Sequence, residues 1–371
     1  MAPGTRDYDI NGAWDTTRYT DWQKELTGGT AHFTNVQGTL SGGNSNIQFL
    51  IGGGYNRQGT VFPGDYADEK ISAHLSLNHV SVNQKLHAEL SAGYINDKSN
   101  LPAIDFTGRL ILAPDAPALY NADGSLNWQN NTFDNPMSRT REHAGSVTNN
   151  LISNLMVRYE LLPGLKAKSV FGYTHIQNNQ SNQSPLSSFP PSYSAYTFLR
   201  SNYFGSTDQK TWNIEPQLSF ERTIGQLKLD VLAGATFRQT VQNASGISAT
   251  DFTSDVLIQN PAAAATQRIV GVNYTQYNYN AVFGRLGVNW LDKYLLNFTA
   301  RRDGSSRFGP GNQFGDFGAL GAAWLFAKER WIRDRLPFLN FGKLRASYGT
   351  TGNDQIPDYM YLSAYSSYYY T

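Results

Sequence analysis

A short run of charged and hydroxyl side chains is the densest group in this sequence that could bind a ligand. Arg302-Asp303-Gly304-Ser305-Ser306-Arg307 brings two guanidinium groups, one carboxylate and two hydroxyls together within six residues. Guanidinium groups bind anionic and polar ligands through charge-assisted hydrogen bonds, and the same bonds can instead hold a loop in place. The run therefore has two possible roles: ligand contact, or an ion-pair network of Arg302, Asp303 and Arg307 at the base of a loop.

Aromatic side chains in two long, charge-poor stretches form a second candidate for binding. These stretches, residues 99–146 and 179–207, are rich in asparagine, and flat apolar rings beside amides suit stacking on sugars or gripping a protein surface. The alternative is that the rings form small cores within the loops, or an interfacial belt. The possible ligand or partner contacts are Tyr120, Trp128, Phe189, Tyr193, Tyr196 and Phe198, and the same stretches contain Phe106, Phe133, Tyr203 and Phe204.

Motifs of enzymatic chemistry are absent from the sequence. The six histidines form no H-E-x-x-H pattern and cysteine does not occur, so a zinc site has little support. Neither a G-x-S-x-G elbow nor a P-loop is present. Asn121-Ala122-Asp123-Gly124 resembles the start of a calcium loop but lacks the downstream glutamate, so a plain turn is the better interpretation. We expect no enzyme, cofactor or metal site, with hydrolase activity as a remote alternative.

Composition excludes several classes of protein. The 371 residues carry a net charge of +1, and 16% of them are charged, against about a quarter in an ordinary soluble domain. The absence of a basic stripe argues against nucleic acid as a partner, and 13% aromatic residues argue against disorder. No apolar stretch reaches the roughly 18 residues of a membrane-spanning helix. The first residues lack a secretory signal, which alone would point to the cytoplasm.

Apolar and polar residues alternate with a period of two along much of the chain, which predicts β-strands. Residues 227–237 show the pattern clearly, with apolar side chains at the odd positions and Lys228 and Asp230 at the even ones. No long stripe with the period of a helix occurs. The chain is therefore expected to be all-β, with about a dozen strands of ~10–14 residues, a length that crosses a bilayer when the strand is tilted.

The connections between these strands alternate between short and long. Short ones are expected at residues 43–45, 82–84, 162–164, 223–226 and 291–292, and long ones at 59–67, 99–146, 179–207, 241–273 and 304–315. Such alternation is typical of an antiparallel transmembrane β-barrel of the bacterial outer membrane, with short periplasmic turns and long external loops. A soluble β-protein is the alternative, but its polar face would be rich in Lys and Glu, whereas this one mixes Asn, Ser, Thr and Gly.

Period-two geometry also predicts which side chains face lipid and which face the lumen. The expected lipid-facing residues are Leu86, Leu90, Leu227, Leu229, Val231, Phe237, Leu296 and Phe298, and the expected lumen-facing residues are Glu89, Lys228, Asp230 and Asn297. Aromatic residues near the strand ends fit interfacial girdles; they are Tyr94, Tyr173, Trp212, Trp290, Tyr294 and Trp324.

Five motifs occur in an order that resembles one known family. Arg302–Gly309 is followed by Leu344–Ile356, and both come after three earlier stretches, Thr20–Glu25, Leu40–Gly43 and Arg57–Val61. Over most of the chain this set is similar to the SusC/RagA-type TonB-dependent outer-membrane transporters of Bacteroidetes. The resemblance implies a barrel of about 22 strands, of which this chain would supply about 12, in a protein of roughly 900–1,000 residues.

The resemblance carries further expectations about organisation and function. Residues 1–30 would follow a plug domain that this sequence lacks, and residues 31–371 would form part of the barrel. The function implied is TonB-dependent import of glycans, oligosaccharides or peptides across the outer membrane, with a SusD-like surface lipoprotein and TonB–ExbB–ExbD as partners and no cofactor. A passive outer-membrane porin and a soluble carbohydrate-binding β-protein are the alternatives.

The resemblance also favours the structural role for the polar run, because family signatures at the bases of loops commonly serve folding. The residues expected to have this role are Arg302, Asp303, Gly304, Ser305, Ser306, Arg307, Arg345, Gly352 and Asn353.

Overall fold

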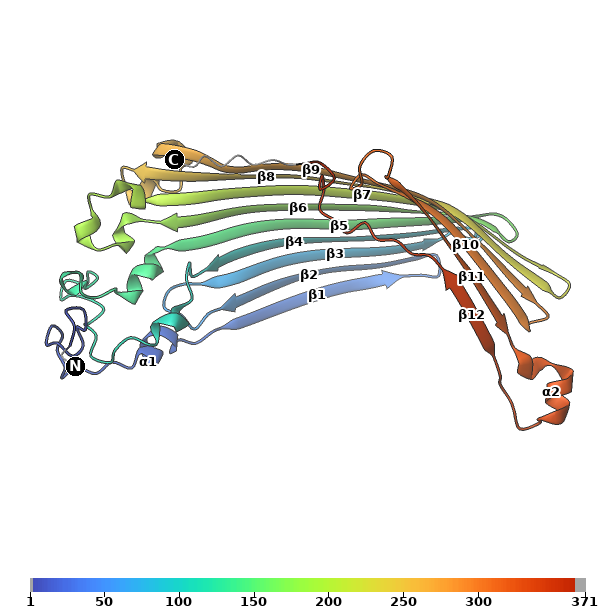
Figure 1. Cartoon of the computed structure of the whole chain (residues 1–371), viewed down its shortest axis with the longest axis horizontal. Helices are drawn as coiled ribbons and strands as arrows, with labels where there is room; N and C mark the ends of the chain where they lie inside the picture. Colours follow the sequence, from blue (N-terminus) through green and yellow to red (C-terminus); the bar gives the residue numbers. More distant parts are fainter. Residues whose placement is uncertain (1–2, 364–371) are drawn as a thin grey trace.

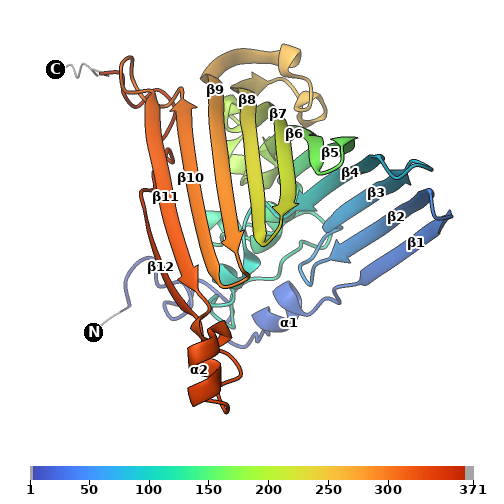
Figure 2. The ribbon, with the colours of Figure 1, turned by 90° about the vertical axis from the view of Figure 1, so that its right-hand side faces the viewer.

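Within residues 3–363, which the computed structural model describes, twelve β-strands form a single antiparallel sheet. Each strand pairs only with its neighbours in the sequence. Figure 1 shows the strands side by side along the length of the molecule, and Figure 2 shows that the sheet curves across its width, with β1 and β12 at its edges. The predicted all-β class and the predicted number of about twelve strands are confirmed.

The elements follow one another as a series of hairpins. The strands are β1 (Phe33–Gly43), β2 (Ile47–Gly59), β3 (Ala67–Val80), β4 (Leu86–Leu101), β5 (His143–Leu162), β6 (Leu165–Ser184), β7 (Ser201–Ile224), β8 (Leu227–Phe252), β9 (Ala264–Trp290), β10 (Tyr294–Ser305), β11 (Phe314–Trp324) and β12 (Leu344–Gly349). The short helices α1 (Trp22–Thr27) and α2 (Arg330–Arg335) lie outside the sheet. No helix within residues 3–363 is both long and apolar enough to cross a membrane.

The central strands are much longer than the sequence pattern predicts. β5 and β6 have 20 residues each, β7 has 24, β8 has 26 and β9 has 27. Much of residues 179–207 and 241–273, which the pattern assigns to loops, is therefore strand, and the loops are residues 185–200 and 253–263. The prediction was wrong there because backbone hydrogen bonds extend the ladder into a region where both faces meet water, so that the alternation disappears.

The short connections lie at one end of the sheet, as predicted (Figure 1). Residues 163–164 and 225–226 are two-residue turns, in which Gly164 and Gly225 have φ angles of +82° and +59°. The connection between β11 and β12 differs from the others, because residues 325–343 contain α2 and a 3-10 helix, η9 (Phe326–Lys328).

The outer face of the sheet is apolar yet exposed. Residues directly opposite each other in neighbouring strands point to the same face, and Val231, Leu286, Phe298 and Leu320 form one such row across β8 to β11. Their side chains are 39%, 41%, 49% and 51% exposed. Soluble proteins rarely leave so continuous an apolar surface in water, so this face suits contact with lipid.

The opposite face is polar, as the period-two pattern predicts. Asp230 lies next to Val231 on β8 and therefore points to the other side, where it accepts a hydrogen bond from Nη2 of Arg285 at 2.7 Å. Asn297 lies on the same inner face, because it occupies the position in β10 next to Phe298.

Aromatic rows mark both edges of the apolar band. At the short-turn end, Trp290, Tyr294 and Trp324 are directly opposite one another, and the rings of Trp290 and Tyr294 are 5.5 Å apart. Toward the long loops, Tyr173 lies opposite Trp212, whose indole nitrogen donates to Gln239. On β8, Leu227 lies opposite Trp290 of the first row and Gln239 lies opposite Trp212 of the second. These two β8 residues are twelve positions apart. Such a span is about 40 Å along the strand and about 28 Å of height at a 45° tilt, close to the roughly 25 Å of an outer-membrane apolar band.

Candidate functional site

The N-terminal segment and the β4–β5 loop share a small hydrophobic core at the long-loop end. Trp22 and Leu26 of α1 pack with Phe106 and Phe133 of that loop, and all four side chains are at most 3% exposed. Two indole nitrogens fasten the segment: Trp14 donates to Thr132 Oγ1 at 3.0 Å and Trp22 donates to the carbonyl of Ala113 at 2.9 Å. Residues 3–31 therefore reach β1 from the long-loop end of the sheet (Figure 1).

A cavity of about 780 Å³ lies between the β4–β5 and β6–β7 loops. Trp128 and Phe189 contribute aromatic surface to its lining, and Asn127, Gln129 and Asn130 contribute amide groups. Aromatic surface with adjacent amides can bind a neutral polar ligand by stacking and hydrogen bonding.

A left-handed turn at residues 129–131 supplies two of the three amides named above, those of Gln129 and Asn130. Gln129, Asn130 and Asn131 follow one another with φ angles of +44°, +54° and +65°, a region that residues other than glycine rarely adopt. Asn131 Oδ1 accepts a hydrogen bond from Ser192 Oγ at 2.8 Å, which joins the turn to the neighbouring loop. Strained backbone of this kind is found preferentially at binding sites.

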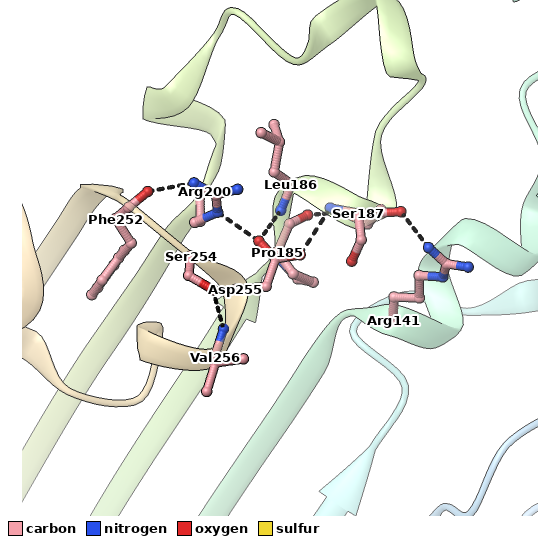
Figure 3. A network of polar contacts seen from close by, with 10 residues as sticks. Arg141, Pro185, Leu186, Ser187, Arg200, Phe252, Ser254, Asp255 and Val256 are labelled. Carbon is pink, nitrogen blue, oxygen red and sulfur yellow. Dashed lines mark hydrogen bonds and ion pairs between the residues drawn. The ribbon is translucent and has the colours of Figure 1, made fainter.

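A polar network beside the cavity ties three loops together (Figure 3). Asp255 of the β8–β9 loop accepts hydrogen bonds from Arg200 Nε at 2.6 Å and from the backbone amides of Leu186 and Ser187 at 3.0 and 3.1 Å. Arg141 of the β4–β5 loop donates to the carbonyl of Ser187 at 3.0 Å. Asp255 is thus the shared acceptor that fixes the β6–β7 loop against the β8–β9 loop.

The protonation of Asp255 controls this network. Burial by itself would raise the pKa of the Asp255 carboxyl, but the hydrogen bonds from Arg200, Ser187 and Leu186 outweigh burial and hold the pKa below its ordinary value. The carboxylate is therefore ionised at neutral pH. The ionised Asp255 stabilises the contacts between these loops. This stabilisation is fully present above the pKa that Asp255 has in the unfolded chain, and it is lost as the pH falls through the lower pKa that Asp255 has in the folded state.

The aromatic residues named from the sequence divide into three groups: core residues, residues that line the cavity, and exposed residues. Phe106 and Phe133 are core residues, and Phe204 packs against a second small core formed by Ala249, Phe252 and Ile258. Trp128 and Phe189 line the cavity, whereas the rings that are largely exposed are Tyr120, Tyr193, Tyr196 and Phe198. The rings of Tyr193, Tyr196 and Phe198 contact one another edge to face, at 5.8 and 5.9 Å.

A second cavity, of about 910 Å³, lies on the inner face of the sheet. Thr236 and Arg238 of β8 and Arg301 of β10 line it, and an inner segment formed by residues 350–358, which follows β12, covers part of it. The segment is held by Tyr277, whose hydroxyl donates to Asp354 Oδ2 at 2.6 Å, and by Arg307, whose Nε donates to Asp358 Oδ1 at 2.8 Å. The guanidinium of Arg307 also lies over the Tyr277 ring, 4.3 Å from its centroid.

The polar run Arg302–Arg307 contributes side chains to both faces of the sheet. Arg302 points outward, where it contacts Asp316 at 3.4 Å and lies over the ring of Phe314. Asp303 points inward and accepts from Arg301, whose other nitrogen donates to the hydroxyl of Tyr279 at 2.6 Å. The sequence pattern missed Arg301, and the network expected among Arg302, Asp303 and Arg307 does not form in the described part of the chain, because adjacent strand residues point to opposite faces.

The remaining signature residues shape this same region. A larger residue at Gly304 or Gly352 would have to displace a neighbouring ring, since an added Cβ would lie 2.6 Å from Phe314 and 2.2 Å from Phe317 respectively. Ser306 exchanges hydrogen bonds with the backbone of Asn278, and Ser305 Oγ accepts from the amide of Arg307. Asn353 Oδ1 accepts from the amide of Gln355, whereas Arg345 is exposed on the edge strand β12.

Comparison with known proteins identifies the kind of wall that this sheet forms. No protein-family model matches the chain. A TonB-dependent receptor of Formosa agariphila is 27% identical over 373 residues, which cover 94% of this chain and 36% of the relative. The TonB-dependent receptor SusC of Bacteroides thetaiotaomicron is 25% identical over 386 residues, which cover 94% of this chain and 36% of that protein. Among solved structures, one described as the RagAB peptide transporter matches with a TM-score of 0.71 at 18% identity and covers 94% of this chain and 40% of its own.

These similarities confirm the resemblance found in the motifs. The chain spans about a third of the length of the curated relatives that it matches. Both relatives are described as TonB-dependent receptors. The sheet is accordingly part of an outer-membrane β-barrel, and in such barrels the long loops lie on the external side.

Proposed function

We propose that this chain, a barrel segment of the SusC/RagA type of TonB-dependent receptor, helps to import glycans, oligosaccharides or peptides across the outer membrane. The observation that carries the proposal is the contrast between the two faces of one sheet. The outer face exposes the apolar row of Val231, Leu286 and Phe298 between two aromatic girdles, while the inner face carries polar side chains around a large cavity. A wall of this kind separates lipid from a polar path.

Two parts of the chain have distinct roles in this proposal. The cavity between the β4–β5 and β6–β7 loops would receive the ligand first, through Trp128, Phe189 and the neighbouring amides. The inner cavity lies along the path that the ligand would take through the lumen, where Arg238 and the Arg301–Asp303 pair offer polar groups. A cavity of several hundred cubic ångströms accommodates a ligand of oligosaccharide or short peptide size.

The energy source and the partners lie outside this chain. A SusD-like lipoprotein would cover the external loops, and TonB–ExbB–ExbD would act on a plug domain. Residues 31–371 would form part of the barrel and residues 1–30 would lead into it. A connection between such a plug domain and β1 must approach β1 from the long-loop end of the sheet, because α1 is packed against the β4–β5 loop.

Uptake by the full-length receptor tests this proposal. Cells would be given fluorescein-labelled oligosaccharides and, separately, fluorescein-labelled peptides, with and without TonB. We expect uptake of one class to require TonB and to fall in a Trp128→Ala/Phe189→Ala variant, while Tyr193→Ala, which changes an exposed ring outside the cavity lining, has a smaller effect. Uptake that persists without TonB would indicate a passive porin, and uptake of neither class would contradict the proposal.

A further inference from the structure

The connection between β11 and β12 is the exception among the short-turn connections. Residues 325–343 project beyond the end of β11 as η9, α2 and an irregular segment (Figures 1 and 2). Several of their large apolar side chains are exposed, namely Trp331 at 57%, Phe338 at 78% and Phe341 at 69%. A connection of this length is not needed to join two antiparallel strands, for which two residues suffice.

The connection is attached on the lipid-facing side of the wall. Tyr294 and Trp324 belong to the outer aromatic row, and both donate to Glu329 Oε1, at 2.6 and 3.3 Å. Lys293 donates to the other oxygen of Glu329 at 2.9 Å, and the ring of Phe326 lies 5.8 Å from that of Trp324. The hydrogen bond from Tyr294, followed by that from Lys293, lowers the pKa of Glu329 to about 2, so this attachment is intact at neutral pH. The connection therefore starts at the level of the aromatic girdle.

The connection between β11 and β12 carries a net positive charge. Residues 325–343 contain five basic side chains against two acidic ones, Glu329 and Asp334. Arg330, Arg333 and Arg335 of α2 are all exposed, while Ile332 is buried. Exposed aromatic rings interspersed with arginines are the composition of segments that lie in a membrane interface, with the rings at the acyl boundary and the cations at anionic headgroups.

From these observations we propose that residues 325–343 form a membrane-surface foot that rests on anionic phospholipid headgroups of the periplasmic leaflet. Three features favour a lipid surface as the occupant: the foot continues the apolar band and its girdle, it begins on the outer side of the wall, and its cations complement anionic headgroups. The foot fixes the height of β11 and β12 relative to the bilayer, because Glu329 connects it directly to Tyr294 and Trp324.

The experiment uses the full-length receptor in bilayer nanodiscs that contain either phosphatidylethanolamine alone or phosphatidylethanolamine with phosphatidylglycerol. This chain contributes no cysteine, and any cysteine elsewhere in the receptor is replaced by serine. A spin label is then placed at Asn340→Cys, between the two exposed phenylalanines, and in a second protein at Gln226→Cys in the plain β7–β8 turn. In the phosphatidylglycerol bilayer we expect the label at residue 340 to contact oxygen dissolved in the acyl region and to be shielded from an aqueous nickel chelate. The label at residue 226 should remain accessible to nickel.

Charge variants separate a lipid surface from other occupants. Arg330→Gln/Arg333→Gln/Arg335→Gln should lower the ratio of docked to undocked foot by about fivefold for each arginine replaced, whereas the three Arg→Lys changes should preserve it. Phe338→Ser/Phe341→Ser should bring the label at residue 340 into water. Heat-modifiable migration of each variant on a gel reports that the barrel has assembled.

Three results would overturn the proposal. The first is free access of nickel to residue 340 in both bilayers. The second is shielding from nickel and oxygen alike, which would indicate that protein covers the foot. The third is a docked fraction that responds neither to phosphatidylglycerol nor to loss of the three arginines.

Discussion

At the scale of single residues, Asp255 is the group through which the β6–β7 and β8–β9 loops depend on each other. Asp255→Asn would weaken the charge-assisted hydrogen bond from Arg200, whose side chain is only 14% exposed. We expect a local cost of about 1.5–3 kcal/mol, seen as faster proteolysis within residues 185–200 of the full-length receptor. Asp123→Asn is the matched control, because the Asp123 carboxylate accepts its hydrogen bonds from Ser125, within its own turn. Equal protease resistance of wild type and Asp255→Asn would contradict this role.

Residues 231 and 236 of β8 test which face of the wall meets lipid. Val231 lies between Phe220 and Leu286 on the outer face, while Thr236 lines the inner cavity. An arginine at position 231 should destabilise the barrel by about 2–4 kcal/mol, because it would lie within the apolar band. Thr236→Arg should be tolerated in the polar lumen. The measurement is denaturant unfolding of the full-length receptor in lipid vesicles. Equal stability of the two variants would contradict the assignment of one face to lipid and the other to the lumen.

The signature residues show what a sequence pattern can and cannot reveal at this scale. The pattern identifies residues 302–307 as a polar loop base. In the structure Arg302 contacts Asp316 of the neighbouring strand β11, and Arg307 contacts Asp358 of the segment that follows β12. The pattern does not identify Arg301 as the partner of Asp303, or Asp354 and Asp358 as the partners of Tyr277 and Arg307. Arg301 and Asp303 are only two residues apart on one face of β10. The other two pairs join positions 77 and 51 residues apart, and only the folded sheet brings those together.

At the scale of elements, two glycines in equivalent turns have different surroundings. A Cβ at Gly164 would lie 2.3 Å from the carbonyl oxygen of Glu221, whereas nothing lies within 4 Å of a Cβ at Gly225. Both residues have positive φ. We expect Gly225→Ala to cost about 1–2 kcal/mol, the ordinary cost of the left-handed region, and Gly164→Ala to cost more, because strand β7 must move.

Thermal unfolding of the full-length receptor compares the two glycine variants directly. The expected order of stability is wild type, then Gly225→Ala, then Gly164→Ala. A Gly164→Ala protein as stable as Gly225→Ala would mean that the β5–β6 turn and β7 are not packed as described.

The strands also show how far periodicity predicts elements. Residues 227–237 are assigned correctly, because one face meets lipid and the other meets the lumen. Residues 241–252 are missed, because that part of β8 no longer has one apolar and one polar face. The pattern thus reports burial in the membrane, whereas strand length is set by backbone pairing, which side-chain polarity does not reveal.

At the scale of the whole molecule, the proposed function and the proposed foot both require the same orientation of the sheet in the membrane. Short turns and the foot lie at one end, and the loops with their cavity lie at the other, with the apolar band between them (Figure 1). This orientation could be predicted from the alternation of connection lengths. The packing of residues 3–31 on the β4–β5 loop could not, since it depends on contacts such as that of Trp14 with Thr132, 118 residues apart.

Labelling of single cysteines on intact cells tests this orientation most directly. In a full-length receptor freed of any cysteine outside this chain, single cysteines are introduced at Tyr196 in the β6–β7 loop, at Tyr19 in the N-terminal segment, at Asn83 in the β3–β4 turn or at Gln226 in the β7–β8 turn. The account predicts that a membrane-impermeant maleimide labels positions 196 and 19 on intact cells, and positions 83 and 226 only after the outer membrane is permeabilised. Labelling of positions 83 and 226 from outside, or equal labelling of all four positions, would contradict it.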